Sequence, residues 1–193
     1  MKYPVVEHFY SLQGEGIYLG TPAYFIRFAG CNLRCEWCDT KESWPTDSAS
    51  SIALEELVKE IPCERVILTG GEPTLQELKP LIDRLHELGH QVAIETNGTR
   101  PIPKEWNLDW ISASPKPESD YALNCVANEL KYVVDENFTL EKIQWDKVPA
   151  GQIFLQVEGG KKESADKAIQ LVSENPEKML RLGIQLHKIG QFR

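Results

Sequence analysis

Three of the five cysteines fall close together in the segment AGCNLRCEWCDT, residues 29–40. Cys31, Cys35 and Cys38 have the spacing C-x3-C-x2-C. A structural zinc site normally closes with four ligands. Three thiolates can instead hold a [4Fe–4S] cube and leave one iron open for a cofactor or substrate, whereas four cysteines are the usual electron-transfer arrangement. The segment therefore predicts a metal centre with an open coordination position.

No other obvious ligand completes a four-coordinate site near this segment. The four histidines lie elsewhere in the chain, at His8, His86, His90 and His187. We interpret Cys63 and Cys125 as ordinary buried cysteines, because free cysteine is among the residue types most often buried. The sequence assigns neither of them a role.

A second polar segment, TGGEP at residues 69–73, follows another apolar run. Glycine lets the backbone approach a ligand closely, and the Glu72 carboxylate suits an ammonium group. On its own this segment is equally compatible with a turn before a helix. Its meaning depends on where the surrounding elements place it.

Short apolar runs alternate with runs of helical period along the chain. This alternation predicts an α/β fold with a mostly parallel sheet, open or curled into a barrel. Gly89 is expected to end the second helix, Thr74 and Glu77 to form a capping box at its start, and Pro80 to kink it. The segment 43–51 is predicted to be a loop. The predicted strands are 23–28, 65–69, 91–96, 109–114, 129–134 and 152–157, and the predicted helices are 52–61, 75–89, 139–148, 164–174 and 176–183.

Glycine and polar residues gather after the ends of these strands. The cysteine segment follows the first strand, TGGEP the second, and Gln156 lies near the end of the last. The segments ETNG (95–98) and SASPK (112–116) close the strands between them. In parallel α/β folds this edge of the sheet is where ligands bind. The sequence therefore predicts one site built from several strand ends.

With the cysteine spacing and GGEP at successive strands, the sequence closely resembles the radical S-adenosylmethionine (SAM) superfamily. The resemblance implies a [4Fe–4S] cluster on Cys31, Cys35 and Cys38, with SAM bound to the open iron. It also implies a partial, trimmed (β/α)6 barrel in a single domain, 1–193, with a cluster loop at 30–40. A zinc or iron–sulfur module without SAM chemistry would leave the strand-end loops unexplained.

Three further segments narrow the resemblance: SLQGEG (11–16), AYFIRFAGCNLRCEWCDT (23–40) and IQLHKIGQFR (184–193). With them the sequence is similar to the 7-carboxy-7-deazaguanine synthases of the queuosine pathway, from about Val5 onward and weakly through 118–150. The resemblance implies a carbon–nitrogen lyase that contracts 6-carboxy-5,6,7,8-tetrahydropterin to 7-carboxy-7-deazaguanine, with loss of ammonia. A 5′-deoxyadenosyl radical takes hydrogen from C6, SAM is regenerated and Mg²⁺ is required.

The same resemblance assigns the cofactor residues. Thr40 is the implied Mg²⁺ ligand, with Asp39 as the alternative. No catalytic side chain is implied beyond the 5′-deoxyadenosyl radical. The residues implied to bind SAM are Trp37, Cys38, Asp39, Gly70, Gly71, Glu72, Asn97, Ser114, Pro115, Lys116, Gln156, Val157, Glu158 and Gly159.

The N-terminal segment 11–16 is the implied substrate loop. Arg27 could take the substrate carboxylate bidentately, although a structural salt bridge is an equal alternative. His187 belongs to the last substrate segment, and Arg193 would contribute its main-chain carboxylate. The residues implied to bind substrate are Leu12, Gln13, Gly14, Glu15, Arg27, Thr69, His187 and Arg193.

Composition limits the possible partners. The net charge of −8, without a basic tract, argues against nucleic-acid or anionic-membrane binding. No apolar run approaches the roughly 20 residues needed to span a bilayer, and the start MKYPVVEHFY lacks a signal-peptide core. We expect a cytoplasmic homodimer that acts on a small pterin and takes electrons from a donor such as flavodoxin. A glycyl-radical enzyme activase and a non-catalytic iron–sulfur electron carrier are the alternative functions.

Overall fold

A computed structural model of the chain describes residues 1–47 and 49–190. Within these residues one nine-stranded sheet has the order β3-β1-β2-β4-β5-β6-β7-β8-β9. Neighbouring strands are parallel from β2 to β9, whereas β1 is antiparallel to both β2 and β3. The strands are β1 (Lys2–Leu12), β2 (Pro22–Phe28), β3 (Ser50–Ala53), β4 (Arg65–Gly70), β5 (Gln91–Thr96), β6 (Trp110–Ala113), β7 (Glu129–Val134), β8 (Ile153–Val157) and β9 (Arg181–Gly183).

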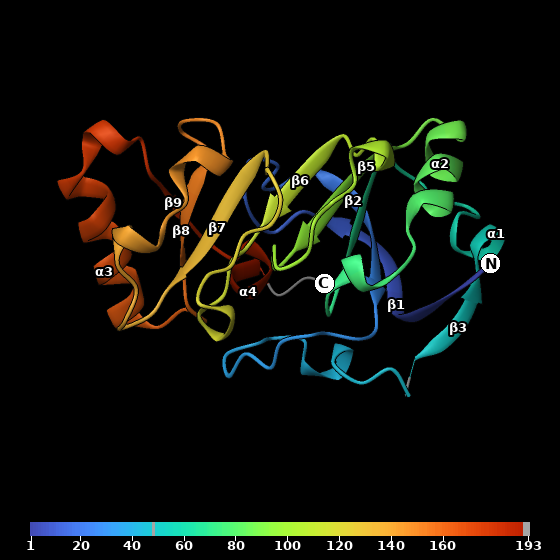
Figure 1. Cartoon of the computed structure of the whole chain (residues 1–193), viewed down its shortest axis with the longest axis horizontal. Helices are drawn as coiled ribbons and strands as arrows, with labels where there is room; N and C mark the ends of the chain where they lie inside the picture. Colours follow the sequence, from blue (N-terminus) through green and yellow to red (C-terminus); the bar gives the residue numbers. More distant parts are fainter. Residues whose placement is uncertain (48, 191–193) are drawn as a thin grey trace.

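The sheet curls without closing, because β3 and β9 are its two ends. Figure 1 shows α1 and α2 beside one end of the sheet and α3 beside the other. The predicted partial barrel, trimmed of outer helices, is confirmed. In the described chain the α-helices are α1 (Leu54–Leu57), α2 (Lys79–Glu87), α3 (Lys162–Glu174) and α4 (Leu186–Gly190). None of them is long and apolar enough to cross a membrane.

The connections between β5 and β8 consist of short 3₁₀ turns and loops. The predicted helix 139–148 is wrong: this segment forms two 3₁₀ turns, Leu140–Lys142 and Trp145–Lys147. The predicted helix 176–183 is also wrong, because a 3₁₀ turn at Pro176–Lys178 leads into β9. Met179 between them has a φ of 50°, in the left-handed region, which interrupts a helix. Both segments are too short and too irregular to propagate a helix alone.

Helix α2 begins later than expected. The predicted capping box is wrong, since α2 starts at Lys79 with no side-chain cap, and Thr74 lies in a 3₁₀ turn. Pro80 is in the first turn of α2, where the missing N–H costs nothing, so it does not kink the helix. Gly89 ends the helix as predicted: its φ is 86° and its N–H bonds to the His86 carbonyl. The predicted helix 52–61 shortens to α1, and the predicted helix 164–174 is confirmed as α3.

Three strands were absent from the prediction: β1, β3 and β9. Strand β1 pairs with β2 on one side and with β3 on the other, so part of the predicted loop 43–51 is a strand. These three strands lie at or near the ends of the sheet, where one face or one edge meets solvent. Their sequences therefore lack the continuous apolar run of a doubly buried strand.

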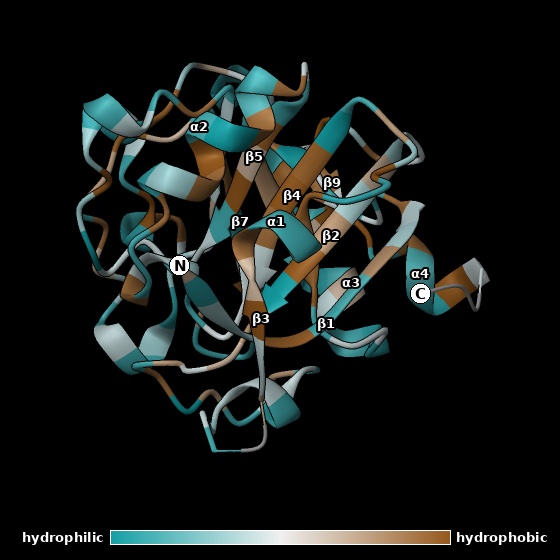
Figure 2. Ribbon diagram, turned by 90° about the vertical axis from the view of Figure 1, so that its right-hand side faces the viewer, coloured by the Kyte–Doolittle hydropathy of each residue, from teal (hydrophilic) through white to brown (hydrophobic). Residues whose placement is uncertain are grey.

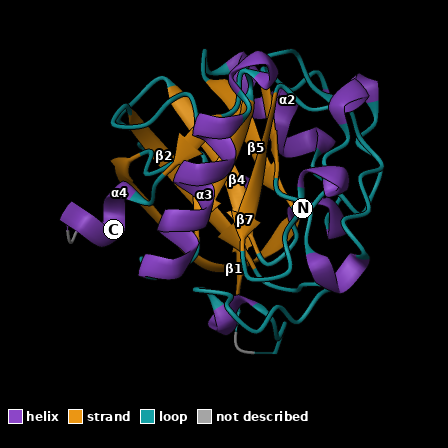
Figure 3. Ribbon diagram, turned by 90° about the vertical axis from the view of Figure 1, so that its left-hand side faces the viewer, coloured by secondary structure: helices purple, strands orange, loops and turns teal. Residues whose placement is uncertain are grey.

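The outer face of the sheet carries the larger cores. Figure 2 shows apolar residues concentrated in the strands, and Figure 3 shows helices and loops arranged around them. One core packs α1, α2 and Trp106 against β1, β2, β4 and β5. A second packs α3, Tyr121 and Phe138 against β7 and β8. These two cores fix the strands in register, and so they fix what the inner face presents.

The inner face changes character along the strands. Phe25, Ile67 and Ala93 face one another on β2, β4 and β5 and form a small apolar cluster, with Trp110 of β6 packed against it. Two residues further along each strand, the same face carries polar side chains. Since successive residues of a strand alternate between faces, this step of two keeps the polar residues on the inner side. An apolar layer therefore lies beneath a polar one.

Candidate active site

A row of polar side chains crosses the inner face at one level of the sheet. Arg27 of β2 is opposite Thr69 of β4, and the Thr69 hydroxyl donates to the Glu95 carboxylate of β5 at 3.2 Å. Glu95 is opposite Ser112 of β6, which is opposite Glu129 of β7. We call these five residues the polar row. Five strands from distant parts of the chain are thus aligned by backbone register to bring one cation, two hydroxyls and two carboxylates together on one face.

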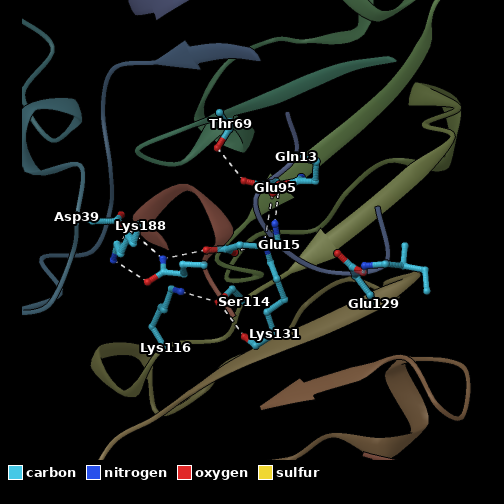
Figure 4. Close-up of polar contacts among 12 residues, drawn as sticks. Gln13, Glu15, Asp39, Thr69, Glu95, Ser114, Lys116, Glu129, Lys131 and Lys188 are labelled. Atoms are coloured by element: carbon cyan, nitrogen blue, oxygen red, sulfur yellow. Dashed lines mark hydrogen bonds and ion pairs between the residues drawn. The ribbon is translucent and has the colours of Figure 1, made fainter. Parts of the chain in front are cut away.

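A buried lysine joins the polar row to the N-terminal loop. Lys131 of β7 donates to the Glu15 carboxylate at 2.8 Å and to Glu95 at 3.2 Å, and Gln13 donates to Glu95 at 3.0 Å. Figure 4 shows Glu15 and Glu95 on either side of the Lys131 ammonium group. Lys131 is only 5% exposed. A buried ion of this kind is tolerable only when it is paired.

The pairing sets the charges of these groups. Burial alone would lower the pKa of Lys131, but the Glu15 and Glu95 carboxylates outweigh it and raise the pKa. Burial alone would raise the pKa of Glu95, but Lys131 and the Gln13 hydrogen bond lower it. Both groups are therefore ionised at neutral pH, and Glu95 presents hydrogen-bond acceptors to the cavity.

The N-terminal loop is also bound by the C-terminal segment. The Gln185 amide donates to Glu15 at 2.9 Å and to Asp39 at 3.1 Å, and Lys188 bonds to Asp39 at 3.1 Å. The Leu186 N–H donates to the Gly14 carbonyl at 2.9 Å. Gln185 therefore connects three segments that the sequence analysis singled out separately: the substrate loop, the cluster loop and the chain end.

Cys31, Cys35 and Cys38 line the same cavity as the polar row. All five cysteines of the described chain are free. Burial raises the pKa of Cys31 and raises that of Cys35 to about 12, so a bound metal is what would ionise these thiols. Three thiols on one loop fit a [4Fe–4S] cluster held by three cysteines with one open iron.

An ammonium group without a carboxylate partner lies beside the cluster loop. Lys116 donates to the Ser114 hydroxyl at 2.6 Å and lies 4.8 Å from the centre of the Trp37 ring. Among the described residues it forms no ion pair. Burial lowers the pKa of Lys116. An anionic group in the cavity would therefore find an available cation here.

The GGEP segment packs against, and is hydrogen-bonded to, the loops around it. A side chain at Gly71 would overlap the Gly30 carbonyl, so the lack of a Cβ permits the close packing of two loops. Glu72 is fully buried and accepts from the Thr74 N–H and hydroxyl, the Thr96 hydroxyl and the Asn97 N–H. This carboxylate does not line the cavity. The expected contact between Glu72 and a ligand ammonium does not agree with this position, because the hydrogen bonds fix the carboxylate in the loop framework.

Two buried polar side chains that line the cavity have no partner in the described protein. The Gln156 amide is 3% exposed and neither its oxygen nor its nitrogen is hydrogen-bonded. The Ser112 hydroxyl is 4% exposed and also unpaired. Such groups cost free energy unless something satisfies them. They point to a polar ligand in a cavity of about 430 Å³, a typical size for a small-molecule site.

Most of the predicted site residues are brought together. The structure places every one of them at this cavity except Glu72, Pro115 and Arg193. Pro115 is buried behind the turn, and Arg193 lies outside the described residues. Sequence reasoning missed other residues of the lining, among them Phe25, Trp44, Glu95, Ser112, Lys131, Gln185 and Lys188. A charge inside an apolar strand, as in ELKYVV, was the signal that could have found Lys131.

Comparison with known proteins agrees with this geometry. The family model described as the radical SAM superfamily matches residues 25–116. A 7-carboxy-7-deazaguanine synthase from Bacteroides thetaiotaomicron is 39% identical, over 100% of both chains. A protein of the same name from Synechocystis is 36% identical, over 97% of this chain and 92% of its own.

The fold agrees as well. The crystal structure of QueE from Escherichia coli superimposes with a TM-score of 0.77 at 28% sequence identity, and the match covers 97% of this chain and 95% of that one. The cysteine loop, the partial barrel and the near full-length similarity all lead to one conclusion. The chain belongs to the 7-carboxy-7-deazaguanine synthase family of radical SAM enzymes.

Proposed function

We propose that this protein contracts 6-carboxy-5,6,7,8-tetrahydropterin to 7-carboxy-7-deazaguanine, with loss of ammonia, in queuosine or 7-deazapurine biosynthesis. The polar row is the observation that carries the proposal. Arg27, a cation, and Glu95, an acceptor, lie two strands apart on one face, and that separation is about 10 Å at the usual strand spacing. A pterin with a carboxylate on one ring and an aminopyrimidine on the other matches this order of charges.

The two ends of the row suit the two ends of the substrate. The Nε–H of Arg27 donates a hydrogen bond to the Glu7 carboxylate at 2.9 Å. The two terminal nitrogens of the guanidinium group are therefore the ones that would bind a substrate carboxylate. The salt bridge and the substrate role are therefore compatible. Glu95 would accept from the N–H groups of the aminopyrimidine, and Ser112 would supply a further hydroxyl.

The substrate loop forms one wall of the cavity. Gln13 and Glu15 would pair with the pterin edge, with Leu12, Gly14, Thr69 and His187 beside them. Gly14 has a structural reason to be glycine, because a Cβ there would overlap the His187 ring. The main-chain carboxylate of Arg193 remains a proposed substrate contact.

The cofactor residues fit a cluster and SAM. A [4Fe–4S] cluster with SAM would supply the radical that takes hydrogen from the substrate. Cys31, Cys35 and Cys38 would hold the cluster, and Lys116 would bind the SAM carboxylate. The other proposed SAM contacts are Trp37, Asp39, Gly70, Gly71, Glu72, Asn97, Ser114, Pro115, Gln156, Val157, Glu158 and Gly159; for Glu72 and Pro115 only a main-chain or indirect contribution agrees with their positions.

Thr40 is the proposed Mg²⁺ ligand. It lines the cavity, and its hydroxyl lies 3.7 Å from the Cys38 sulfur. The Asp39 carboxylate is bound by Gln185 and Lys188, which supports Thr40 over Asp39. One hydroxyl would act together with waters and substrate oxygens, as is usual for Mg²⁺.

We further propose that the chain works as a single-domain cytoplasmic homodimer reduced by a donor such as flavodoxin. A net charge of −8 supports the expectation that neither nucleic acid nor an anionic membrane is a partner. Sedimentation would test the dimer, and reduction of the cluster by purified flavodoxin would test the donor.

An anaerobic assay tests the function. The reconstituted, reduced protein is incubated with SAM, Mg²⁺ and carboxytetrahydropterin, and the products are identified by mass spectrometry. We expect 7-carboxy-7-deazaguanine without stoichiometric loss of SAM. SAM cleavage without this product would refute the proposed substrate and would favour the alternative function, a glycyl-radical enzyme activase. An intact cluster without SAM cleavage would favour a non-catalytic iron–sulfur electron carrier.

A further inference from the structure

Glu129 is a buried carboxylate that the proposed chemistry does not use. It is the β7 member of the polar row, 3% exposed, and it does not line the cavity. Its Oε2 accepts a hydrogen bond from the Ile17 N–H at 2.8 Å. Figure 4 shows Glu129 on the far side of the N-terminal loop from Asp39 and Lys116. The loop, rather than the ligand, is what Glu129 contacts.

The preceding residue of the loop is shaped to this contact. Gly16 has a φ of +70°, and a Cβ at this position would overlap both oxygens and the Cδ of the Glu129 carboxylate. Glycine is required here both by the backbone conformation and by the close approach. Gly16 and Glu129 therefore fit each other as a pair.

A buried carboxylate needs a reason to be retained. Burial disfavours its charged form unless hydrogen bonds and a nearby cation compensate. Lys131, two residues along the same face of β7, supplies the nearby positive charge. An apolar side chain would fill this space at lower cost, so what Glu129 adds is an acceptor that holds the loop backbone.

That hold is placed where it can set the substrate contacts. The Glu15 N–H bonds to the Gln13 side-chain oxygen at 3.1 Å, so Gln13 and Glu15 are fixed to each other. Lys131 fixes the Glu15 carboxylate, and Glu129 fixes the Ile17 N–H two residues on. Adjacent inward positions of β7 thus bind the loop at two points.

We propose that Glu129 is a positioning residue, which acts through Gly16 and the Ile17 N–H to set Gln13 and Glu15 against the substrate. This inference rests on the proposed function, because it assumes that Gln13 and Glu15 bind the pterin. It assigns no contact between Glu129 and any ligand.

Steady-state kinetics of Glu129→Ala, Glu129→Gln and the wild type test the proposal. Glu129→Ala is expected to raise KM for the pterin about tenfold with kcat changed less than about twofold, as for loss of one charged hydrogen bond. Glu129→Gln is expected to recover most of the loss, because its amide oxygen can still accept from Ile17. Iron content and SAM affinity should stay at wild-type values, and Glu87→Ala on the exposed surface of α2 is the matched control.

The pair with Gly16 gives a sharper test. Gly16→Ala should raise KM in the wild type and do so less in the Glu129→Ala background, where the overlap is removed. An unchanged KM in Glu129→Ala, in a preparation whose wild type turns over, would overturn the proposal, as would equal losses in SAM affinity and kcat.

A second readout separates this proposal from the function itself. If the wild type makes no product, the proposed function fails, and hydrogen exchange of a peptide covering residues 13–19 still decides the positioning role. Exchange at Ile17 should be faster in Glu129→Ala than in the wild type. Identical exchange would overturn the role of Glu129 whatever the substrate.

Discussion

The two sides of the cavity are built in different ways. The part of the cavity proposed to hold the cofactors, here called the cofactor side, consists of loops that follow strands, with the three cysteines in one loop and Ser114 to Lys116 in another. The part proposed to hold the substrate, here called the substrate side, consists of strand interiors, with Arg27, Glu95 and Lys131 brought together by register. In a loop, spacing along the chain directly limits distance in space, whereas in a sheet neighbours come from distant segments. The first kind of site is therefore visible in sequence and the second is not.

The two sides also differ in how their charges are satisfied. On the substrate side, Lys131 is paired with two carboxylates, and Glu95 with three donors. On the cofactor side, the Lys116 ammonium group contacts the Ser114 hydroxyl and the Trp37 ring but forms no ion pair among the described residues, and the Gln156 amide is unpaired. The charges of the substrate side are thus already paired within the protein, apart from the neutral Ser112 hydroxyl, which is unpaired, while the cofactor side still offers an unpaired cation.

The largest expected effect is on the cofactor side. Cys35→Ala should abolish cluster assembly and all turnover, because two thiolates would remain for a cluster that needs three. Iron content, visible absorbance and SAM cleavage measure this. Cys63→Ala is the control, because Cys63 does not line the cavity and its thiol donates a hydrogen bond to the Arg65 carbonyl. The Cys63→Ala variant should retain the cluster. Full activity in Cys35→Ala would refute the cluster role.

The next largest effect is on the substrate side. Lys131→Met should lower kcat/KM about a hundredfold and destabilise the fold by about 1–3 kcal/mol, because two partly buried carboxylates lose their shared cation. Thermal unfolding and steady-state kinetics measure both. The exposed Lys162→Met is the control. A variant with wild-type stability and kcat/KM would show that the substrate side is not held by this ion network.

The same variant makes a prediction about pH. Because the pKa of Lys131 is raised in the folded protein, its contribution to folding stability is full below the ordinary pKa of 10.5 and is lost as pH rises through the pKa of the folded state. Because the pKa of Glu95 is lowered, its contribution to folding stability is full above the ordinary pKa of 4.5 and is lost as pH falls through the pKa of the folded state. Removing Lys131 raises the pKa of Glu95, so the acid limb of the kcat/KM profile should move to higher pH. A limb at an unchanged pH would contradict the coupling.

A smaller effect is expected at the boundary between the two sides. Thr40→Ala should raise the Mg²⁺ concentration for half-maximal activity about tenfold without loss of the cluster, since it would remove the proposed protein ligand and leave the waters and substrate oxygens. Magnesium titration at saturating SAM and substrate measures this. An unchanged titration would move the ligand elsewhere, with Asp39 the first alternative.

The smallest effect is expected at Ser112. Its hydroxyl is buried without a partner, so Ser112→Ala should leave stability unchanged or slightly higher while KM for the pterin rises about two- to fivefold, as for a neutral hydrogen bond. Binding and thermal unfolding, measured together, separate the two effects. Lower stability with unchanged KM would show that the hydroxyl serves the fold.

The contrast between loops and strands also explains what sequence reasoning could predict. The six central strands were predicted because doubly buried strands are continuous apolar runs. Their alternation with runs of helical period predicted that the sheet is mostly parallel. The segments 139–148 and 176–183 were predicted as helices from local pattern alone, but 3₁₀ turns and the edge strand β9 take their place.

The site divides in the same way. The cysteine loop and the turn from Ser114 to Lys116 were identified from motifs. Glu95 and Ser112 begin the segments ETNG and SASPK but were given no role, and Lys131 was missed inside a predicted strand. Only register reveals that these three residues are neighbours. The hydrogen-bond donors of Glu72 could not be predicted from the sequence either. They belong to Thr74, Thr96 and Asn97, which surround the carboxylate only in the folded chain.

A crystal structure of the reconstituted protein with SAM and carboxytetrahydropterin would show whether strand register orients the substrate. We expect the pterin carboxylate within hydrogen-bonding distance of Arg27 and the aminopyrimidine N–H groups at Glu95, with the cluster on Cys31, Cys35 and Cys38. A pterin bound in the reverse orientation, or away from the polar row, would contradict it.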